Sequence, residues 1–318
     1  MKPYRAPGWL PGGQAQTLWP LVIKPLPIPL RRERWTTPDG DFIDVDHLDG
    51  PVESPLLVLF HGLEGSARSH YARSTAHTCQ KIGWRLALPH FRGCSGELNQ
   101  QPRAYHSGDS AEIDWILRRL HHGNGGQRLH VVGISLGGNA LLKWAGEQKQ
   151  AASELVTGVA GICAPLDLAA CGHHLARGIN RIYTRHFLDT LKARSAARLA
   201  RFPGLFDPER MHRARNLWEF DDAVTGPVHG FAGADDYWAR SSAKPWLKSI
   251  AVPALVINPK NDPFLPSVAL PGTADISPSV LLEQPATGGH VGFVSGPFPG
   301  NLDWLPQRLL HFFVSETE

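Results

Sequence analysis

The stretch Leu129-His130-Val131-Val132-Gly133-Ile134-Ser135-Leu136-Gly137-Gly138-Asn139 decides the fold of this chain. Its first four residues form a mostly apolar run typical of a buried strand, and Asn139–Ala145 is rich in helix-forming residues. Between them, Gly133–Gly137 fits G-x-S-x-G, and strand, sharp turn and helix are the context in which this motif forms a nucleophile elbow. We therefore predict that the turn presents the Ser135 hydroxyl at one edge of a sheet. The alternative is a glycine-rich turn that happens to contain a serine.

Length and composition are those of a globular protein with a large core. The chain has 318 residues, 42% of them hydrophobic, which suits a single α/β domain with an insertion. Its formal net charge is only +3, and Lys and Arg are scattered along it, so nothing indicates a nucleic-acid partner.

The cysteines and the apolar runs bear on the cellular compartment of the protein. The four cysteines form no C-x-x-C pair, so we expect reduced thiols. The first residues lack the basic and apolar pattern of a leader, and apolar runs such as Leu56–Phe60 are too short for an integral membrane segment. These features predict a soluble, cytoplasmic protein.

Sixteen histidines raise the question of a metal site. The pairs His121-His122 and His173-His174 are adjacent, so their side chains would point in different directions on a helix. Neither pair has a carboxylate at the spacing suited to chelation. We predict no metal and no cofactor.

Apolar runs of strand type alternate with helical stretches, a pattern that predicts a mostly parallel sheet with helices on both faces. Ligands bind beyond the carboxyl ends of the strands in such sheets. An additional strand near Phe42–His47 is expected to be antiparallel, at the edge. The predicted strands are Leu56–Phe60, Arg85–Pro89, Leu129–Gly133, Val156–Ile162, Ala254–Asn258 and Val280–Glu283, and the predicted helices are Tyr71–Ile82, Ser110–Leu120, Leu136–Gln148 and Asp303–Phe313.

Two regions interrupt this alternation within a single domain spanning residues 1–318. The first thirty residues are rich in proline and glycine, and we expect them to wrap the surface without a core of their own. The second region, Leu166–Lys248, is rich in arginine and aromatic residues and follows the strand after the Ser135 helix. Its position favours a helical cap insertion over the active-site edge, the alternative being helical decoration with a solvated basic face.

A serine hydroxyl needs a base that takes its proton and an acid that orients the base. Where the serine lies on a nucleophile elbow, the chain order is Ser, then Asp or Glu, then His. Asp262 follows an apolar strand and precedes Pro263, which disfavours a helical conformation there. His290 follows the last predicted strand, and the glycines beside it permit a close approach to the serine. Ser135, Asp262 and His290 are thus predicted to meet at one edge of the sheet.

Three other aspartates compete with Asp262 for the acid role. Asp167 lies after an earlier strand, whereas Asp235 and Asp236 fall in the predicted cap. The chain order and the position after a strand favour Asp262.

Acyl transfer also needs donors for the oxyanion that develops in the transition state. The first helical residue after the serine, Leu136, is predicted to supply one backbone N–H. The loop after Leu56–Phe60 is predicted to supply the other from Leu63. We expect His61 to brace this loop by hydrogen bonding and the Glu64 carboxylate to point away from the oxyanion.

Together these segments resemble the YheT-like branch of the α/β-hydrolases, which is related to the membrane-anchored lipases of mammals. The resemblance implies the α/β-hydrolase fold, esterase-type activity and a triad of Ser135, Asp262 and His290. It extends over nearly the whole chain and is carried by Trp9–Thr17, His61–Ser66, His90–Gly96, Tyr105–Gly108, Gly133–Asn139, Phe202–Gly204, Phe220–Asp222, Asp236–Trp238, Asn261–Phe264 and Gly289–His290.

The chain departs from that family's pattern at two positions. Gln14 stands where the family usually has histidine, and Asn261 stands where it often has an acidic residue. Neither position belongs to the predicted triad. The membrane helix of the mammalian relatives has no counterpart in this sequence.

These patterns predict a serine carboxylester hydrolase that acts on a small-molecule or lipid-like acyl ester through an acyl-enzyme. The apolar and aromatic residues of the predicted cap favour a medium-length or lipid-like acyl chain. Acyl transfer to an alcohol and perhydrolysis would use the same triad. A non-catalytic ligand-binding protein that retained the fold is an alternative of a different class.

Overall fold

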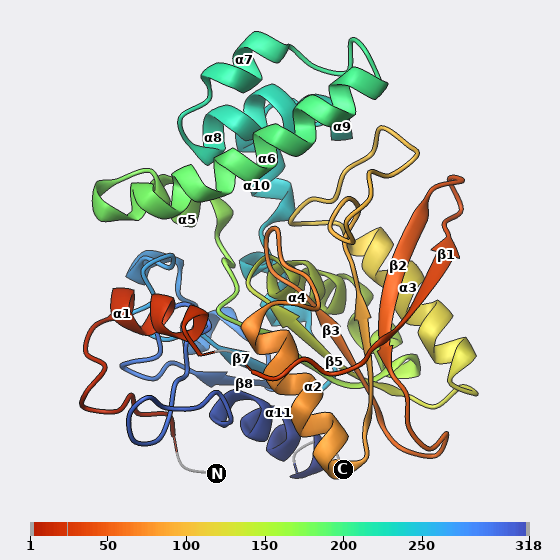
Figure 1. Cartoon of the computed structure of the whole chain (residues 1–318), viewed down its shortest axis with the longest axis vertical. Helices are drawn as coiled ribbons and strands as arrows, with labels where there is room; N and C mark the ends of the chain where they lie inside the picture. The colour runs from red at the N-terminus through yellow and green to blue at the C-terminus, as the bar shows by residue number, and fades with distance from the viewer. Residues whose placement is uncertain (1–2, 24, 316–318) are drawn as a thin grey trace.

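Eight strands form one sheet in the computed structural model, which describes residues 3–23 and 25–315. The order across the sheet is β1-β2-β4-β3-β5-β6-β7-β8 (Figure 1). Pairing is antiparallel between β1 and β2 and between β2 and β4, and parallel elsewhere. The strands are β1 (Arg31–Thr36), β2 (Phe42–Leu48), β3 (Leu56–Phe60), β4 (Arg85–Pro89), β5 (Leu129–Ile134), β6 (Val156–Ile162), β7 (Ala254–Ile257) and β8 (Val280–Glu283).

The predicted mostly parallel sheet is confirmed, with one error at its edge. The β2 strand is antiparallel, as expected, but β1 pairs outside it and occupies the edge. The β1 strand was not predicted because most of its side chains are charged. Arg32 forms two hydrogen bonds with Asp46 on β2, and Arg34 does the same with Asp44. The β1 strand is therefore held by charged side chains of β2, and a search for apolar alternation in the sequence does not detect it.

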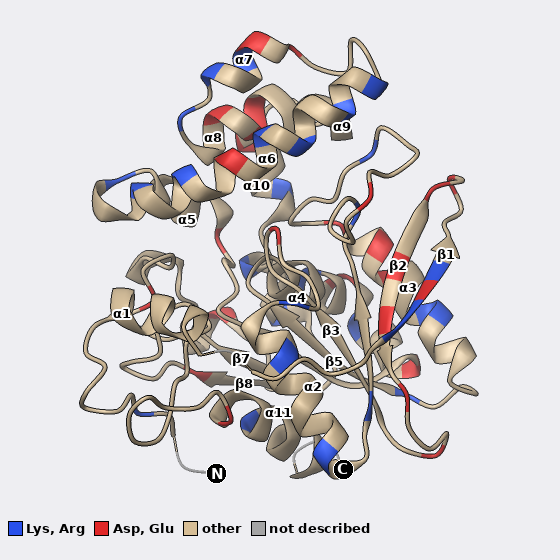
Figure 2. Cartoon of the chain, in the orientation of Figure 1, with Lys and Arg blue, Asp and Glu red and all other residues tan. Residues whose placement is uncertain are grey.

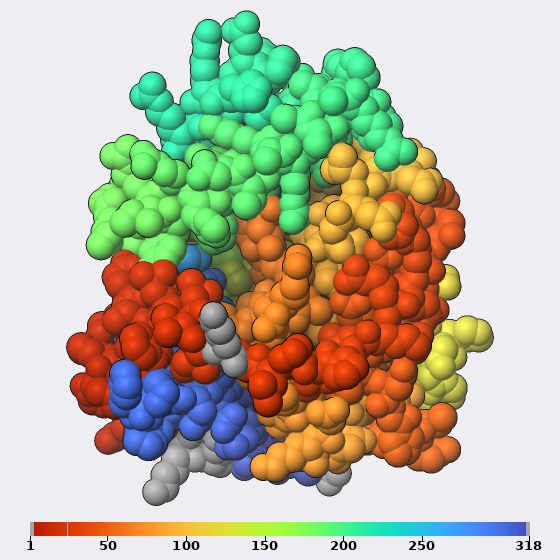
Figure 3. Space-filling view, in the orientation of Figure 1, coloured from red at the N-terminus to blue at the C-terminus, as the bar shows by residue number. Residues whose placement is uncertain are grey.

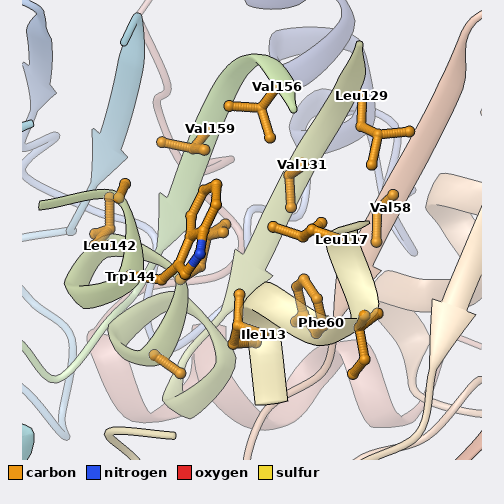
Figure 4. Close-up of a cluster of buried hydrophobic side chains, with 14 of the residues drawn as sticks. Val58, Phe60, Ile113, Leu117, Leu129, Val131, Leu142, Trp144, Val156 and Val159 are labelled. Carbon is orange, nitrogen blue, oxygen red and sulfur yellow. The ribbon is translucent and has the colours of Figure 1, made fainter. Parts of the chain in front are cut away.

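Helices cover both faces of the sheet. Alternate residues of β3 point to opposite sides: Val58 and Phe60 pack with α3 and α4 (Figure 4), whereas Leu57 and Leu59 pack with α2 and α11. The helices are α1 (Gly13–Leu18), α2 (His70–Ile82), α3 (Ser110–Gly123), α4 (Leu136–Gln148), α5 (Leu168–Leu175), α6 (Arg181–Arg201), α7 (Pro208–Arg213), α8 (Leu217–Phe220), α9 (Gly226–His229), α10 (Ala234–Ser241) and α11 (Trp304–Ser315).

The helices α5 to α10 all lie between β6 and β7 in the sequence and gather at one end of the molecule (Figure 1). They have a small apolar cluster of their own, which includes Leu188, Met211 and Phe220. Basic residues are spread along the longest of them, α6 (Figure 2). Asn139 on α4 ties the base of this group to the sheet, because its buried amide donates to Ser241 O and accepts from Ala243 N.

The N-terminal segment is more ordered than its composition predicts. It contains α1 and buries Tyr4 and Leu10. The Tyr4 hydroxyl donates to the carbonyl oxygen of Val294 at 2.7 Å, and Leu10 packs with Val294. These buried side chains pack against the C-terminal part of the domain, so the segment has no separate core among the described residues. Residues 1, 2 and 24 lie outside the described residues.

The four cysteines are buried and unpaired, as their spacing predicted. Among the described helices, none has the length and hydropathy that crossing a membrane requires.

Candidate active site

Ser135 ends β5 and begins α4 with an unusual backbone conformation, φ 52° and ψ −118°. Glycines are required on either side of it. A Cβ atom on Gly133 would lie 2.4 Å from the carbonyl oxygen of Gly137, and one on Gly137 would lie 2.5 Å from that of His61. The strand and the helix can thus close around the serine only because both side chains are absent.

The structure brings Ser135, Asp262 and His290 into one hydrogen-bonded row. The Ser135 Oγ lies 3.0 Å from His290 Nε2, and His290 Nδ1 lies 2.8 Å from Asp262 Oδ2. Because a carboxylate only accepts, the row implies a proton on Nδ1 and leaves Nε2 free to accept from the serine. Asp262 follows β7 and His290 follows β8, so neighbouring parallel strands bring them together.

Asp262 and His290 are held from several sides. The other carboxylate oxygen of Asp262 accepts from the backbone N–H of Phe264 at 2.8 Å. The Phe264 ring stacks on the His290 ring with centroids 4.0 Å apart. His70 also contacts this loop, because its Nε2 donates to the carbonyl oxygen of Val291, and burial lowers the pKa of His70 so that it stays neutral. The orientation of the imidazole is therefore fixed by packing as well as by Asp262.

The three competing aspartates are engaged elsewhere. Asp167 caps α5 by accepting from the backbone N–H of Ala170. Asp235 accepts from the indole of Trp218, and Asp236 accepts from the backbone N–H of Ala232. Each of them thus has a local structural role.

One group of metal-ligating side chains lies in the described part of the chain, and it coincides with this row. Ligand atoms of Cys163, Asp262 and His290 lie within 4.8 Å of one another. The hydrogen bond between His290 and Asp262 already uses two of these atoms. Burial raises the pKa of the Cys163 thiol well above its usual range, and the thiol accepts from Val291 N. Hydrogen bonds within the protein thus account for all three ligand atoms.

The loop after β3 lies directly beside the serine. A Cβ atom on Gly62 would be 3.2 Å from the Cβ of Ser135. The backbone N–H of Gly62 donates to the Tyr71 hydroxyl, and that of Glu64 donates to the Tyr105 hydroxyl. The intervening residue, Leu63, lines the same cavity as Ser135 and Leu136.

His61 braces this loop, as predicted. Its Nδ1 donates to the carbonyl oxygen of Gly62, and its Nε2 accepts from the backbone N–H of Phe91. Burial lowers the pKa of His61 to about 3, so the ring is neutral and can accept. The Glu64 carboxylate accepts from the Tyr105 hydroxyl and lies 3.1 Å from Arg194 Nε, so an arginine neutralises its charge.

Two residues of α1 support the site, and their roles were missed from the sequence. The Gln16 Oε1 accepts from the Asn261 side chain and from the backbone N–H of Gly288, both at 2.9 Å. The Thr17 Oγ1 accepts from the backbone N–H of His290 at 2.9 Å. The sequence offers two signals there, a polar run within a segment rich in breakers and the motif Trp9–Thr17 that contributes to the family resemblance, and neither assigns these roles. The partners lie more than 240 positions away along the chain, beyond the reach of any local pattern.

A cavity extends from Ser135 and His290 into the helices α5, α6, α8 and α10. Its wall is mostly apolar, with Leu168, Leu175 and Phe187 among the residues that line it. The space-filling view shows a hollow beneath the green helices α5 and α6, beside the red N-terminal segment (Figure 3).

Comparison with known proteins places the chain in a family. The profile of the alpha/beta hydrolase fold matches residues 55–297. The chain is 39% identical to YheT of Escherichia coli (strain K12) over 291 residues, which cover 90% of this chain and 85% of YheT. It is 27% identical to phospholipase ABHD3 of Homo sapiens, over 98% of this chain and 78% of that protein.

Solved structures agree on the fold. Est1E from Butyrivibrio proteoclasticus superposes with a TM-score of 0.56 at 12% identity, covering 89% of this chain and 98% of Est1E. The esterase Pf2001 of Pyrococcus furiosus gives 0.56 at 14% identity, over 91% of this chain and 92% of the esterase. The sheet order, the serine elbow and the matches in sequence lead to one conclusion: this chain belongs to the α/β hydrolase family.

Proposed function

We propose that this protein is a serine carboxylester hydrolase. The observation that carries the proposal is the row from Ser135 Oγ through His290 to Asp262, with distances of 3.0 and 2.8 Å. Nucleophile, base and orienting acid stand in hydrogen-bond contact, which is the arrangement that activates a serine. Relatives named as a phospholipase and a monoacylglycerol lipase support a reaction at an ester bond.

The proposed steps of ester hydrolysis follow from the positions of the protons in this hydrogen-bonded row. The Ser135 oxygen attacks the ester carbonyl while its proton passes to His290 Nε2, and Asp262 holds the imidazole in the correct tautomer and stabilises the imidazolium. His290 then gives the proton to the departing alcohol, which leaves an acyl-enzyme on Ser135. Water loses a proton to His290, attacks the acyl group and releases the acid and the free serine. No cofactor takes part in these steps.

The oxyanion of each tetrahedral intermediate needs hydrogen-bond donors. We assign the backbone N–H groups of Leu63 and Leu136 to this role. Leu136 is the first residue of α4, whose amide end favours negative charge. The hydroxyls of Tyr71 and Tyr105 bind the amides on either side of Leu63, and so fix the direction of the loop.

The insertion 166–248 serves, in this proposal, as a cap that shapes the acyl site. Support comes from the shared cavity, in which side chains of α5 and α6 face the same space as Ser135. The apolar wall favours a medium-length or lipid-like acyl chain, because burial of each methylene contributes about 0.8 kcal/mol.

The first test is covalent labelling. A fluorophosphonate probe should modify the protein, and peptide mass spectrometry should map the adduct to Ser135. The labelled protein should lose hydrolysis of p-nitrophenyl esters of graded chain length in proportion to the extent of labelling. Absence of both labelling and hydrolysis would favour the ligand-binding alternative, and an ester product with an added alcohol would instead identify acyl transfer.

The Thr17 hydroxyl provides a second prediction. Thr17→Val keeps the shape of the side chain but leaves the backbone N–H of His290 without its acceptor. An unsatisfied buried donor costs about 1–3 kcal/mol, so we expect kcat to fall about tenfold with KM nearly unchanged, because the base is displaced and the cavity is not. Thr17→Ser restores the acceptor and should recover kcat. Steady-state kinetics of both variants decide this, and a wild-type kcat in Thr17→Val would remove Thr17 from the positioning of His290.

A further inference from the structure

Arg198, near the end of α6, is a buried cation whose side chain forms no hydrogen bond or ion pair with any residue the structure describes. The Arg198 residue is only 8% exposed, and it lines the same cavity as Ser135 and His290. In the part of the chain that the structure describes, no side chain or carbonyl oxygen forms a hydrogen bond or ion pair with its guanidinium. This lack of a partner distinguishes Arg198 from the other arginines in the cavity wall.

The two other arginines of the wall are fully engaged. Arg194, four residues earlier on α6, pairs with Glu64 and donates to the carbonyl oxygen of Gly93 at 2.6 Å. Arg92 binds Glu112 and two further carboxylates. Glu64 acts on Arg198 electrostatically, but Arg194 already neutralises it.

The remaining titratable groups of the cavity wall do not compensate for Arg198. Asp221 is mostly ionised near pH 7, since burial raises its pKa only to about 6. Its carboxylate accepts from the Trp238 indole and the Thr225 hydroxyl, and within the described structure it forms no ion pair with Arg198. Burial lowers the pKa values of His106 and His229, so both rings are neutral near pH 7. Among the described residues, no titratable group of the cavity wall therefore neutralises the charge of Arg198 by direct contact.

A guanidinium cannot relieve this situation by losing its proton, because its pKa lies far above neutrality even after burial lowers it. A buried charge without a partner is costly, and an incoming oxyanion would offset that cost with two parallel hydrogen bonds. Arginine is also the side chain whose planar fork matches carboxylate and phosphate groups. The chemistry of the wall thus specifies an anionic group in the ligand.

We propose that the substrate carries a carboxylate or phosphate group that pairs with Arg198 while its ester bond lies at Ser135. The two residues line one cavity, so a single molecule can contact both. This inference rests on the proposed ester hydrolysis and deepens it, because it gives the substrate a charge as well as an apolar part.

Two pairs of esters test the proposal, one for each kind of anion. The carboxylate pair is mono-p-nitrophenyl glutarate and its methyl ester, and the phosphate pair is butyryl glycerol phosphate and monobutyrylglycerol. In at least one pair, the wild type should prefer the anionic member in kcat/KM. Arg198→Gln should lower that ratio roughly tenfold to a hundredfold, as expected for hydrogen bonds to a charged group. The pair that responds identifies the anion.

The matched control is Arg185→Gln, which removes an exposed arginine of the same helix and should leave the ratio unchanged. Arg198→Gln breaks no hydrogen bond or ion pair of the described structure, so the variant should fold, as circular dichroism would verify. A ratio that is the same in the wild type and in Arg198→Gln for both pairs would overturn the anion site while leaving ester hydrolysis intact.

Binding provides a readout that does not depend on hydrolysis. Calorimetric titration of Ser135→Ala with glutarate and with glycerol phosphate should show binding of one of them, weakened tenfold or more by Arg198→Gln. If the wild type cleaves no ester but this binding depends on Arg198, only the proposed reaction fails. If neither anion binds with a dependence on Arg198 and the kinetic ratio is also unaffected, the anion site is wrong.

Discussion

Ser135→Ala is expected to lower kcat for ester hydrolysis by about a millionfold, the scale measured when the nucleophile of a serine hydrolase is removed. The hydroxyl at 3.0 Å from His290 Nε2 is the proposed nucleophile, and alanine supplies no oxygen in its place. The backbone amides of Leu63 and Leu136 would remain, so a residual rate above that in water is expected from them. Initial rates with the best p-nitrophenyl ester measure the loss.

The fold should survive this change, because alanine keeps the Cβ that already tolerates the backbone conformation at Ser135. Thermal unfolding of Ser135→Ala should therefore resemble that of the wild type. Ser153→Ala, in a short helical turn outside the site, is the matched control and should keep full activity. A Ser135→Ala protein that retained wild-type kcat would exclude the acyl-enzyme route.

Much of the candidate site could be predicted because it follows the logic of parallel strands. Ser135 comes directly after β5, whereas Asp262 and His290 lie in the loops that follow β7 and β8, and the carboxyl ends of parallel strands share an edge. The apolar runs identified those strands, so the positions of the polar residues after them followed. His61 was predictable for the same reason, as it lies in the loop after β3.

The parts that the sequence did not reveal depend on contacts between charged or polar groups far apart along the chain. The strand β1 is held by ion pairs between its arginines and the aspartates of β2, so it carries no apolar alternation. The hydrogen bond from His290 N to Thr17 joins residues 273 positions apart. The isolation of Arg198 is visible only when the partners of every neighbouring charge are known. Local patterns specify strands and helices, whereas the pairing of polar side chains is settled by tertiary structure.

The serine elbow and the loop after β3 pack closely against each other beside Ser135. Close approach between Gly137 and the carbonyl oxygen of His61 places the loop after β3 against the first turn of α4. The candidate oxyanion donors come from these two elements. The same close packing that requires glycine in the elbow therefore brings the candidate donors near the proposed nucleophile.

Asp262→Asn is the second change with a very large expected effect, a fall in kcat of about ten thousandfold with little change in KM. Asp262 Oδ2 accepts from His290 Nδ1 at 2.8 Å, which keeps the lone pair of Nε2 directed at Ser135. An asparagine can turn its amide toward Nδ1 and donate, and the imidazole proton then moves to Nε2, where it blocks proton transfer from the serine. The substrate cavity keeps its shape, because Asn and Asp are nearly equal in size.

The competing aspartates serve as matched controls for this prediction. Asp167→Asn and Asp235→Asn make the same chemical change at other positions. Asp167 caps α5, and Asp235 binds the Trp218 indole. Because capping and surface changes of this kind cost little stability, kcat of both variants should stay within about twofold of the wild type. Steady-state kinetics on the same ester decide among the three. If Asp167→Asn lost activity while Asp262→Asn kept it, the acid of the triad would be Asp167, and the hydrogen-bonded row at Ser135 would have another role. The geometry favours the opposite result, because only Asp262 among these aspartates contacts the histidine that contacts the serine.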